Sequence, residues 1–523
     1  MAQPSPPRSG HVYLNGRTLE GGGQLVRIAV ALSALTGRPV SIDNIRGNRK
    51  GKKGLKRSHI AAVRLLGQIS DSGYSGNALD SQSLNFLPPL PRERGGFFVD
   101  QSQVKVKTEY RIELATAGSI CLIFQALYPY LLHVGSQSPG PFVSVEMIGG
   151  TNTSKSPSYD YLSQVVLPNF EKLGLPPVAA VLESRGWSSG NDTLGKIVFH
   201  IQPLRSRNAS TDGDEGSRPE IFPLEGERSA IPNKFPKIDL MAHDPGKITQ
   251  IDLTVLAPDL KGNYAEDMGD GESILPTYIK QTLKQKLRSA LRKVNPSVFR
   301  PPQTHSHDRD SLSGDADVEA PVPIRVHTSE LTWHRSQTYI LLVAHTSTGF
   351  RIGHDALGTY GTGRPKKPKT KGRDKPRPAN DDWRRELKNG LFDGATELIN
   401  QCVEGFVEEI SNGIPADETG TKRTVARKAC LDRHMRDQIV VFEALGDACH
   451  ARTISETANG TPPEDARDWT LHTRTAQWVC RQFLGDQAYA VIELGCKGID
   501  SIRFISVKLD SNITTPHSFP SGR

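Results

Sequence analysis

Two absences narrow the class of protein to which this sequence belongs. Its 523 residues contain only six cysteines, none of them in a C-x-x-C pair. This spacing argues against a zinc site or a disulfide framework and favours a reducing compartment. No run of about 18 apolar residues occurs, so we expect no membrane-spanning helix. The first ten residues are rich in Pro and Ser and lack the apolar segment of a signal peptide.

Apolar residues are scarce as well. Hydrophobic residues make up 36% of the chain, against 48 Gly and 36 Pro residues, which indicates segments outside any packed core. We expect long disordered loops at 205–235, 299–322 and 358–382. At about 100–200 residues per domain, the chain length predicts two to four structural units.

Positive charge is in excess, but only locally. The formal net charge is +8, and residues 46–57 contain seven basic residues and no acidic one. Residues 364–377 contain eight basic residues and one acidic residue, so the rest of the chain is mildly acidic. A uniformly basic coat protein is therefore excluded. The segment 364–377 resembles a nuclear-localisation run and predicts the nucleoplasm, with the cytoplasm and a merely solvated loop as alternatives.

Strands alternate with helices in the first 200 residues. The order of strand, glycine turn and helix recurs within 11–36, 110–132 and 143–173, which predicts a duplicated unit in an α/β (α+β) fold. The helix expected over 24–36 ends at Gly37, in the usual position for a helix cap.

Beyond residue 203 the pattern becomes irregular. We expect the following elements there: a strand over 249–256, a helix over 278–294, two strands within 330–354, helices over 390–410, 429–445 and 475–484, and strands over 489–494 and 501–507. A second domain inserted into the first is the natural interpretation. The predicted organisation is a flexible N-terminus at 1–10, a main domain formed by 11–204 and 426–523, and a smaller inserted domain at 205–425.

Three glycines open the first predicted helix, in Glu20-Gly-Gly-Gly-Gln24-Leu-Val-Arg27. They let backbone N–H groups approach a ligand at a helix N-terminus, where an anion is favoured. Gln24 and Arg27 project from one face of the first turn, and Glu20 adds a carboxylate that suits Mg²⁺ when phosphates are present. An ordinary glycine turn with solvated Glu20 and Arg27 is an equally supported alternative.

Arg46 and Arg49 follow the end of a predicted strand, where ligands gather in α/β folds. Their guanidinium groups suit phosphate, and the basic residues of 50–57 suit a nucleic-acid backbone, although a solvated basic loop is the alternative. Residues 190–196 match the start of a P-loop. We reject that motif because Ile197 replaces the required Ser or Thr and a strand follows instead of a helix.

His472 stands just before the predicted helix 475–484. Positive potential at a helix N-terminus disfavours its protonation and favours a bound anion. A neutral imidazole could then attack a phosphate, although an isolated histidine is more often structural.

Taken in order, these segments resemble the RNA 3′-terminal phosphate cyclase family, particularly its eukaryotic members. The resembling segments are 19–27, 44–49, 117–119, 149–152, 345–350, 433–438 and 471–476. The resemblance extends over 11–200, 323–360 and 385–523. It implies EPSP synthase-like repeats of strand–helix units, with a smaller α/β domain inserted.

The resemblance also implies a reaction. ATP adenylylates a histidine, AMP passes to an RNA 3′-phosphate, and the neighbouring 2′-OH displaces AMP to leave a 2′,3′-cyclic phosphate. The implied nucleophile is His472, and the implied ligand of a divalent cation (Mg or Mn) is Glu20. The other implied site residues are Gln24, Arg27, Arg46 and Arg49 near the RNA or ATP phosphates, and Pro157, Tyr161, His434, Asp437 and Gln438 in the adenylate pocket.

Two residues depart from the family pattern. Ser58 stands where bacterial members carry Gln, and His434 replaces a pocket Tyr. The implied partners are ATP and RNA with a 3′-phosphate end, without a membrane, and the oligomeric state stays open. One alternative is a non-catalytic cyclase-like RNA-binding protein acting in ribosome biogenesis, but that branch lacks the histidine that is present here as His472. A small-molecule transferase on a related fold is disfavoured by the basic segment 46–57.

Overall fold

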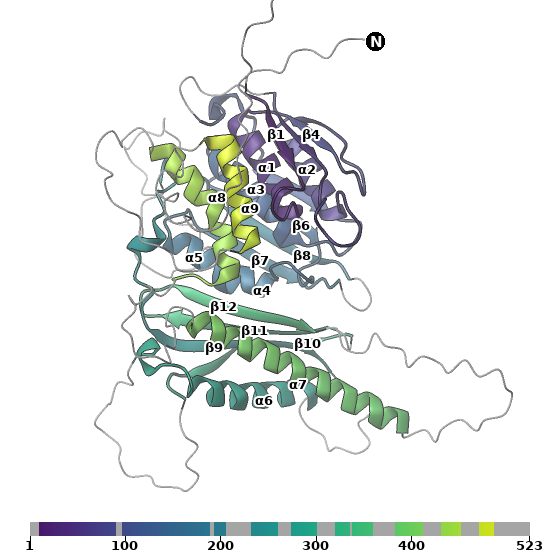
Figure 1. Cartoon of the computed structure of the whole chain (residues 1–523), viewed down its shortest axis with the longest axis vertical. Helices are drawn as coiled ribbons and strands as arrows, with labels where there is room; N and C mark the ends of the chain where they lie inside the picture. The colour runs from purple at the N-terminus through teal and green to yellow at the C-terminus, as the bar shows by residue number, and fades with distance from the viewer. Residues whose placement is uncertain are drawn as a thin grey trace, which may run out of the picture.

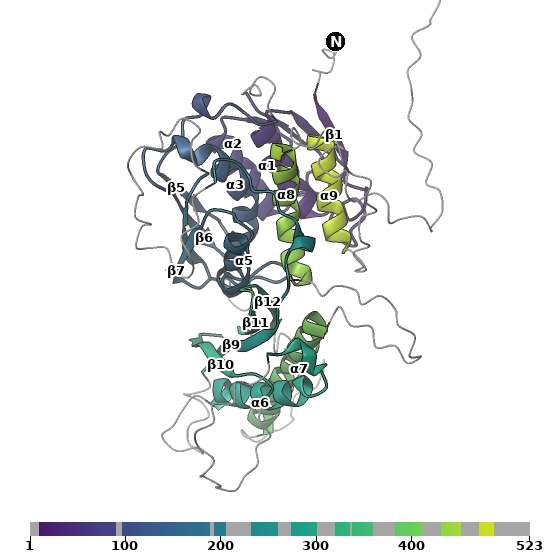
Figure 2. The ribbon, with the colours of Figure 1, turned by 90° about the vertical axis from the view of Figure 1, so that its left-hand side faces the viewer.

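Two hydrophobic cores divide the described part of the chain. The computed structural model describes residues 10–89, 97–188, 193–204, 232–259, 274–300, 320–334, 337–358, 382–411, 430–450 and 470–485. They form a mixed α/β fold with three four-stranded sheets. We call the two sheets β1–β4 and β5–β8 with helices α1–α5, α8 and α9 the main unit. The sheet β9–β12 with α6 and α7 is the second unit (Figure 1, Figure 2).

The first sheet of the main unit has the strand order β1-β2-β4-β3, in which β1 and β2 are parallel and the other pairs are antiparallel. Its elements are β1 (Val12–Asn15), α1 (Gly23–Thr36), β2 (Val40–Asp43), α2 (Arg57–Ile69), β3 (Gly73–Ser75) and β4 (Leu84–Leu87). The helix predicted over 24–36 is confirmed, and Gly37 follows it in the left-handed conformation with φ of 64°.

The second sheet repeats this arrangement with the order β5-β6-β8-β7 and one parallel pair, β5 with β6. Its elements are β5 (Glu109–Glu113), α3 (Ile120–Val134), β6 (Val143–Gly149), α4 (Tyr159–Tyr161), a π-helical turn (Leu162–Val166), α5 (Leu167–Lys172), β7 (Val178–Ser184) and β8 (Gly195–Ile201). The shared strand order supports the predicted duplication, which stays a prediction.

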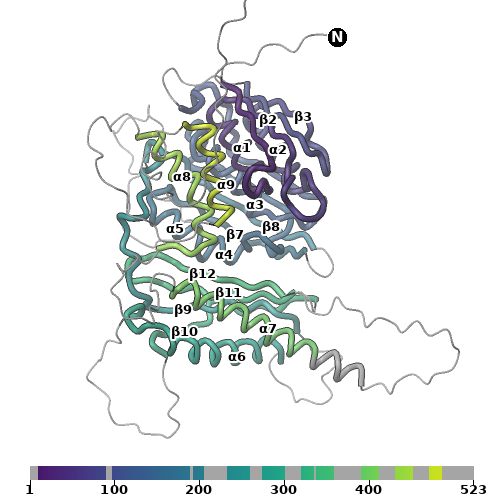
Figure 3. Tube along the Cα trace, viewed as in Figure 1, coloured from purple at the N-terminus to yellow at the C-terminus, as the bar shows by residue number. Residues whose placement is uncertain are grey.

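Helices fill the interior of the main unit. α3 is apolar on nearly every side, and such a helix must be buried all round. α1 packs against α2 and α3, and it also packs against α9 (Leu471–Leu484), which in turn packs against α8 (Arg433–His450). The chain thus returns from the second unit to lay its last described helices beside its first (Figure 3).

The second unit has the sheet order β10-β9-β11-β12. Its elements are β9 (Ile248–Pro258), α6 (Ile274–Leu291), β10 (Ile324–Thr332), β11 (Thr338–Thr346), β12 (Arg351–Gly358) and α7 (Asp382–Ser411). α6 and α7 cover one face, and β12 contacts the α4 region of the main unit. The predicted boundaries at 205 and 425 lie outside the described residues, so the division into domains stays a prediction.

Several sequence-based element predictions need correction. β3, β4 and β7 were not predicted because they are short or largely exposed and lack a clear apolar alternation. The two strands expected within 330–354 are three strands between 324 and 358. The strands expected over 489–494 and 501–507 lie outside the described residues. Among the described helices, none is long and apolar enough to cross a membrane.

Candidate active site

Three helix N-termini meet at one end of the main unit. α1 and α2 follow the parallel strands β1 and β2, so both begin at the carboxyl-terminal edge of the sheet. A Cβ at Gly23, the first residue of α1, would collide with Nε2 of His59 in the first turn of α2. Nδ1 of His472, in the first turn of α9, lies 3.1 Å from Oε1 of Gln24. Free N–H groups and helix dipoles therefore favour an anion here.

The glycine turn before α1 is joined to the basic segment after β2. Gly21 has φ of +57°, and a Cβ there would collide with the carbonyl oxygen of Gly16. The Gly21 carbonyl accepts a hydrogen bond from the backbone N–H of Arg46 at 2.9 Å. Arg46 has φ of 60°, in the left-handed region that residues other than Gly seldom occupy. Such a strained backbone is typical of functional positions.

Glu20 is the central acid of the site and is only 9% exposed. Its carboxylate forms an ion pair with Arg49, and its Oε2 lies 2.6 Å from Nδ1 of His472. Its backbone N–H donates to Oγ1 of Thr475 at 3.3 Å, which ties the turn to α9. Apart from these two contacts, the two buried carboxylate oxygens have no hydrogen-bond partner among the residues that the structure describes. Hard carboxylate oxygens with spare bonding capacity fit a divalent cation.

A cation at Glu20 would need further ligands from outside this cluster. Among the described residues, no group of three or more His, Cys, Asp or Glu side chains is arranged to hold a metal ion. Mg²⁺ at phosphate sites is usually bound by one or two carboxylates, with phosphate oxygens and water as the other ligands.

The atoms around His472 determine its tautomer. Both atoms close to Nδ1 are acceptors, Oε2 of Glu20 and Oε1 of Gln24, so Nδ1 carries the proton and Nε2 keeps its lone pair. Burial lowers the pKa of His472, the Asp437 carboxylate opposes this shift, and the charges of Arg49 and Arg27 lower the pKa again. The imidazole is thus neutral and nucleophilic near pH 7.

The start of α9 corrects the sequence-based prediction. His472 was expected just before a helix beginning at 475, but α9 begins at Leu471 and contains His472 in its first turn. Thr470 is the N-cap, since its hydroxyl accepts from the backbone N–H of Thr473 at 3.0 Å. The Thr470 hydroxyl donates to Oδ1 of Asp437 at 2.9 Å, and the Thr473 hydroxyl donates to the same oxygen. Asp437 of α8 therefore fixes the helix turn that carries His472.

Three arginines surround the site as a cation cluster, Arg27, Arg46 and Arg49. Burial lowers the pKa of Arg27 to about 10, although its guanidinium stays charged near pH 7. Burial and the charges of Arg27, Arg46 and Lys56 lower the pKa of His59 to about 3, so this imidazole is neutral. Within the described part of the chain, the buried Nε atoms of Arg46 and Arg49 have no hydrogen-bond partner. A phosphate would supply the missing acceptors.

The predicted adenylate pocket lies beside the first turns of α8. His434, Asp437 and Gln438 are spaced i, i+3 and i+4 and share one helix face. The exposed His434 ring meets the Tyr161 ring edge-on, with centroids 6.4 Å apart. Gln438 accepts a hydrogen bond from Gln125 of α3. The rise from His434 to Gln438 is about one helical turn, so these residues lie close to Asp437 and its α9 partners.

A family model decides which family this geometry belongs to. The model described as RNA 3′-terminal phosphate cyclase matches residues 18–489. The chain belongs to this family. Relatives with that printed name include a protein of Ignicoccus hospitalis, 35% identical over 227 residues that cover 43% of this chain and 56% of the relative. A protein of Methylococcus capsulatus is 33% identical over 202 residues, covering 38% of this chain and 52% of the relative.

A third cyclase, of Thermococcus onnurineus, is 33% identical over 196 residues, which cover 38% of this chain and 50% of the relative. The chain thus spans about half the length of the curated relatives that it matches.

The structure brings the predicted residues of the cyclase site together in two connected groups. The first contains His472, Glu20, Gln24 and the cation cluster, which share the contacts described above. The second is the predicted adenylate pocket, joined to the first through Asp437. Pro157 is half-buried and directly precedes Ser158, the N-cap of α4. The role of each residue stays a prediction.

Sequence reasoning missed two residues. His59 is buried in the first turn of α2, where its spacing in an amphipathic helix was the available signal. Asp432 directly precedes α8 and accepts from the backbone N–H groups of His434 and Met435, as an N-cap does. The helix predicted over 429–445 begins at Arg433 instead, and that misplaced start concealed the cap.

Proposed function

We propose that the chain is an ATP-dependent RNA 3′-terminal phosphate cyclase, a ligase-class enzyme with His472 as its nucleophile. One observation carries the proposal: Glu20 and Gln24 hold Nδ1 of His472, which leaves the Nε2 lone pair available beside the cation cluster. The family match supports the reaction class. ATP and an RNA with a 3′-phosphate end are the proposed substrates.

In the first step Nε2 of His472 attacks the α-phosphorus of ATP. A nitrogen–phosphorus bond forms, the bond from the α-phosphorus to the bridging oxygen breaks, and pyrophosphate leaves. The Nδ1 proton stays on the ring, and the Glu20 carboxylate stabilises the positive charge that the ring acquires. Arg27 and Arg49, together with the helix N-termini, stabilise the charge that develops on the phosphate oxygens.

The next two steps transfer AMP and close the ring. An oxygen of the RNA 3′-phosphate attacks the same phosphorus, and the bond to His472 breaks, which restores the neutral imidazole. The vicinal 2′-OH then attacks the 3′-phosphorus and loses its proton, so that AMP leaves and a 2′,3′-cyclic phosphate remains. Arg46 and Arg49 are the proposed partners of the RNA phosphate, since their buried Nε atoms lack acceptors.

Glu20 is the proposed ligand of a divalent cation, Mg or Mn. When bound, the cation would act as a Lewis acid that neutralises phosphate charge. The assignment depends on the buried oxygens of Glu20, which have no hydrogen-bond partner apart from their ion pairs.

The test is to incubate the protein with ATP radiolabelled at the α-phosphate and a divalent cation. We expect an acid-labile protein–AMP adduct that His472→Ala abolishes. His327→Ala is the matched control, because His327 is an exposed histidine on β10 of the second unit. The adduct should then be chased by an RNA with a 3′-phosphate, and an RNA with a 3′-OH serves as the inert substrate.

Two outcomes would contradict the proposal. A wild-type protein without an adduct would support the non-catalytic RNA-binding alternative. An undiminished adduct in His472→Ala would place the nucleophile elsewhere.

We also propose that the basic segment 364–377 directs the protein to the nucleus. Its sequence composition supports this, with eight basic residues among fourteen positions. A fluorescent fusion should lose nuclear enrichment when these basic residues are replaced by Gln. An unchanged distribution would remove the proposal.

A further inference from the structure

A buried carboxylate, that of Asp432, bonds to both units beside residues of the predicted adenylate pocket. Asp432 is 1% exposed and accepts four hydrogen bonds. Oδ1 accepts from the Tyr161 hydroxyl at 2.5 Å and from the backbone N–H groups of His434 and Met435 at 3.1 and 2.9 Å. Oδ2 accepts from the backbone N–H of Gly353, in β12 of the second unit, at 2.9 Å.

The two carboxylate oxygens of Asp432 therefore bond to different parts of the molecule. Oδ1 fixes two members of the predicted pocket, since it caps the helix turn that carries His434 and holds the Tyr161 ring through its hydroxyl. Oδ2 faces only the second unit. The geometry sets the Tyr161 and His434 rings edge-on with an interplanar angle of 88°. The ring of His354, in β12 of the second unit, also lies beside the exposed His434 ring, with centroids 6.2 Å apart.

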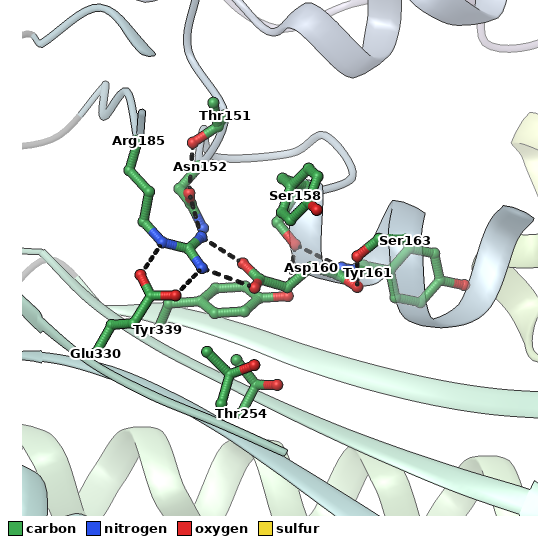
Figure 4. A network of polar contacts seen from close by, with 12 residues as sticks. Thr151, Asn152, Ser158, Asp160, Tyr161, Ser163, Arg185, Thr254, Glu330 and Tyr339 are labelled. Carbon is green, nitrogen blue, oxygen red and sulfur yellow. Dashed lines mark hydrogen bonds and ion pairs between the residues drawn. The ribbon is translucent and has the colours of Figure 1, made fainter. Parts of the chain in front are cut away.

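The neighbouring segment 157–161 shows the same dependence on the second unit. Pro157 and Tyr161 belong to the predicted pocket. Between them, the side chains of Ser158 and Asp160 bond to partners outside it (Figure 4). The Ser158 hydroxyl lies 2.6 Å from the Tyr339 hydroxyl of β11. Asp160 takes part in a set of ion pairs that crosses the interface between the two units.

These ion pairs are formed by Arg185, which directly follows β7. Its Nη1 and Nη2 donate to the two carboxylate oxygens of Asp160 at 2.7 and 3.0 Å. Its Nε and Nη2 donate to Glu330 of β10 at 2.6 and 3.1 Å. Figure 4 shows Arg185 between the two carboxylates, one from each unit. Residues of the predicted pocket and of the interface thus share one short segment.

We propose that Asp432 is a positioning residue for nucleotide binding, through which contact with β12 of the second unit sets the Tyr161–His434 wall of the adenylate pocket. The inference rests on the proposed function and assigns the second unit a part in it. Asp432 touches no reacting atom in this proposal. Its loss should therefore weaken ATP binding while sparing the chemical step at saturating ATP.

Three substitutions separate the contacts of Asp432. Asp432→Asn keeps an acceptor at Oδ1, and Asn caps helices as well as Asp does, but its amide N–H₂ would face the N–H of Gly353. Tyr161→Phe removes only the hydroxyl. Gly353→Ala disturbs the contact from the second unit, because its Cβ would lie 2.6 Å from Cγ2 of Val165 and 3.1 Å from the Tyr161 ring.

The matched control is Asp100→Asn. Asp100 also caps a helical turn of the main unit, where its Oδ1 accepts from the backbone N–H of Ser102 at 3.0 Å, but it has no contact with the predicted pocket. Binding is measured calorimetrically with α,β-methylene ATP, which cannot transfer AMP. The single-turnover adduct rate at saturating ATP and the thermal midpoint are measured alongside.

We expect Asp432→Asn and Gly353→Ala to raise the Kd for the analogue about tenfold, and Tyr161→Phe to raise it about threefold. The saturating adduct rate should stay within about twofold of wild type, and Asp100→Asn should bind like wild type. The double variant Asp432→Asn/Gly353→Ala should bind the analogue no more weakly than the weaker of the two single variants, since both substitutions act at one contact.

Each contrary result identifies what is wrong. A wild-type protein that does not bind the analogue overturns the proposed function and this inference with it. Wild-type binding with equal affinity in Asp432→Asn overturns the inference alone, even if the thermal midpoint falls. Weaker binding in Asp432→Asn but not in Gly353→Ala removes the second unit from the proposal. A slower saturating rate at unchanged affinity would make Asp432 part of the chemistry and also overturn it.

Discussion

The main unit and the second unit are built from the same kind of mixed four-stranded sheet, yet they use their helices differently. In the second unit α6 buries a stripe at every fourth residue, which lies against the sheet and α7. The members of this stripe are Leu275, Ile279, Leu283, Leu287 and Leu291. In the main unit the helix N-termini meet at one point instead, and polar side chains gather there.

The difference shows where chemistry is possible in this molecule. A helix packed by its apolar side stabilises a fold but offers a ligand little. Helix N-termini offer unpaired N–H groups and a positive potential, and three of them adjoin near His472. The second unit meets the main unit at contacts such as that between Asp432 and Gly353. Four predictions test this division, each with a variant at the site and a matched variant elsewhere in the chain.

The largest effect is expected from Arg49→Ala. Arg49 pairs with Glu20, and its buried Nε has no acceptor until a phosphate arrives. We expect cyclisation of an RNA 3′-phosphate to slow by about a hundredfold, as for other lost transition-state donors. Deletion of 364–377, the basic segment between β12 and α7, should change the rate by less than about twofold. Equal losses in both variants would show that the two basic segments share one role.

The next effect concerns acid stability. His59 is neutral in the folded protein, with a pKa of about 3 caused first by burial, whereas an unfolded histidine titrates near about 6.5. Between these values the unfolded state binds the extra proton, so stability is present above about pH 6.5 and is lost as pH falls toward 3.

In urea unfolding curves measured at several pH values, His59→Gln should reduce the pH dependence of the free energy of unfolding. The reduction is up to one proton, or about 1.4 kcal/mol per pH unit. His327→Gln, which changes an exposed histidine of the second unit, should leave the dependence as it is. If the free energy of unfolding of His59→Gln depends on pH as in the wild type, another group takes up the proton.

A smaller effect is expected from Thr473→Val. The Thr473 hydroxyl donates to Asp437 beside His472, so its loss should loosen the first turn of α9 and slow adduct formation about tenfold. Thr396→Val in α7 removes a hydroxyl that donates to the Phe392 carbonyl at 2.8 Å and should leave the adduct rate unchanged. Equal rates in both variants would show that the hydrogen bond from Thr473 to Asp437 does not position His472.

The smallest effect is a shift in pH profile. The Arg27 charge helps to lower the pKa of His472, so Arg27→Gln should move the acidic limb of adduct formation to higher pH. The sign follows because protonation removes the Nε2 lone pair, and a higher pKa makes that occur at higher pH. Arg325→Gln, on the exposed strand β10, should not move the limb. A limb that moves to lower pH in Arg27→Gln would reverse the argument.

Local spacing in the sequence predicted part of this site correctly. Gln24 and Arg27 lie in the first turns of one helix, as their spacing indicates, and Gly37 ends that helix. The predicted start of the helix that carries His472 was off by a few residues. Helix caps depend on hydrogen bonds, which a periodic pattern does not contain. Thr470 accepts from Thr473 and starts α9 earlier than the apolar residues suggest.

Other parts of the site could not be predicted from local patterns. His59 is buried against Gly23 because α1 and α2 pack side by side, and burial, not residue type, makes its imidazole neutral. Asp432 bonds to Tyr161 and Gly353, which belong to distant parts of the chain. Such contacts arise only when separate elements pack together.

The sequence by itself determined the residue types, the glycine turn, the two basic segments and the family to which they belong. Only the tertiary structure decided which atoms meet. His472 and Gln24 are 448 positions apart, and they touch because α9 packs against α1 in a common core. Packing also buries Glu20 between Arg49 and His472, and so turns common polar residues into a site with a neutral, oriented imidazole. Desolvation and long-range contacts depend on the folded chain, which is why spacing alone could not reveal them.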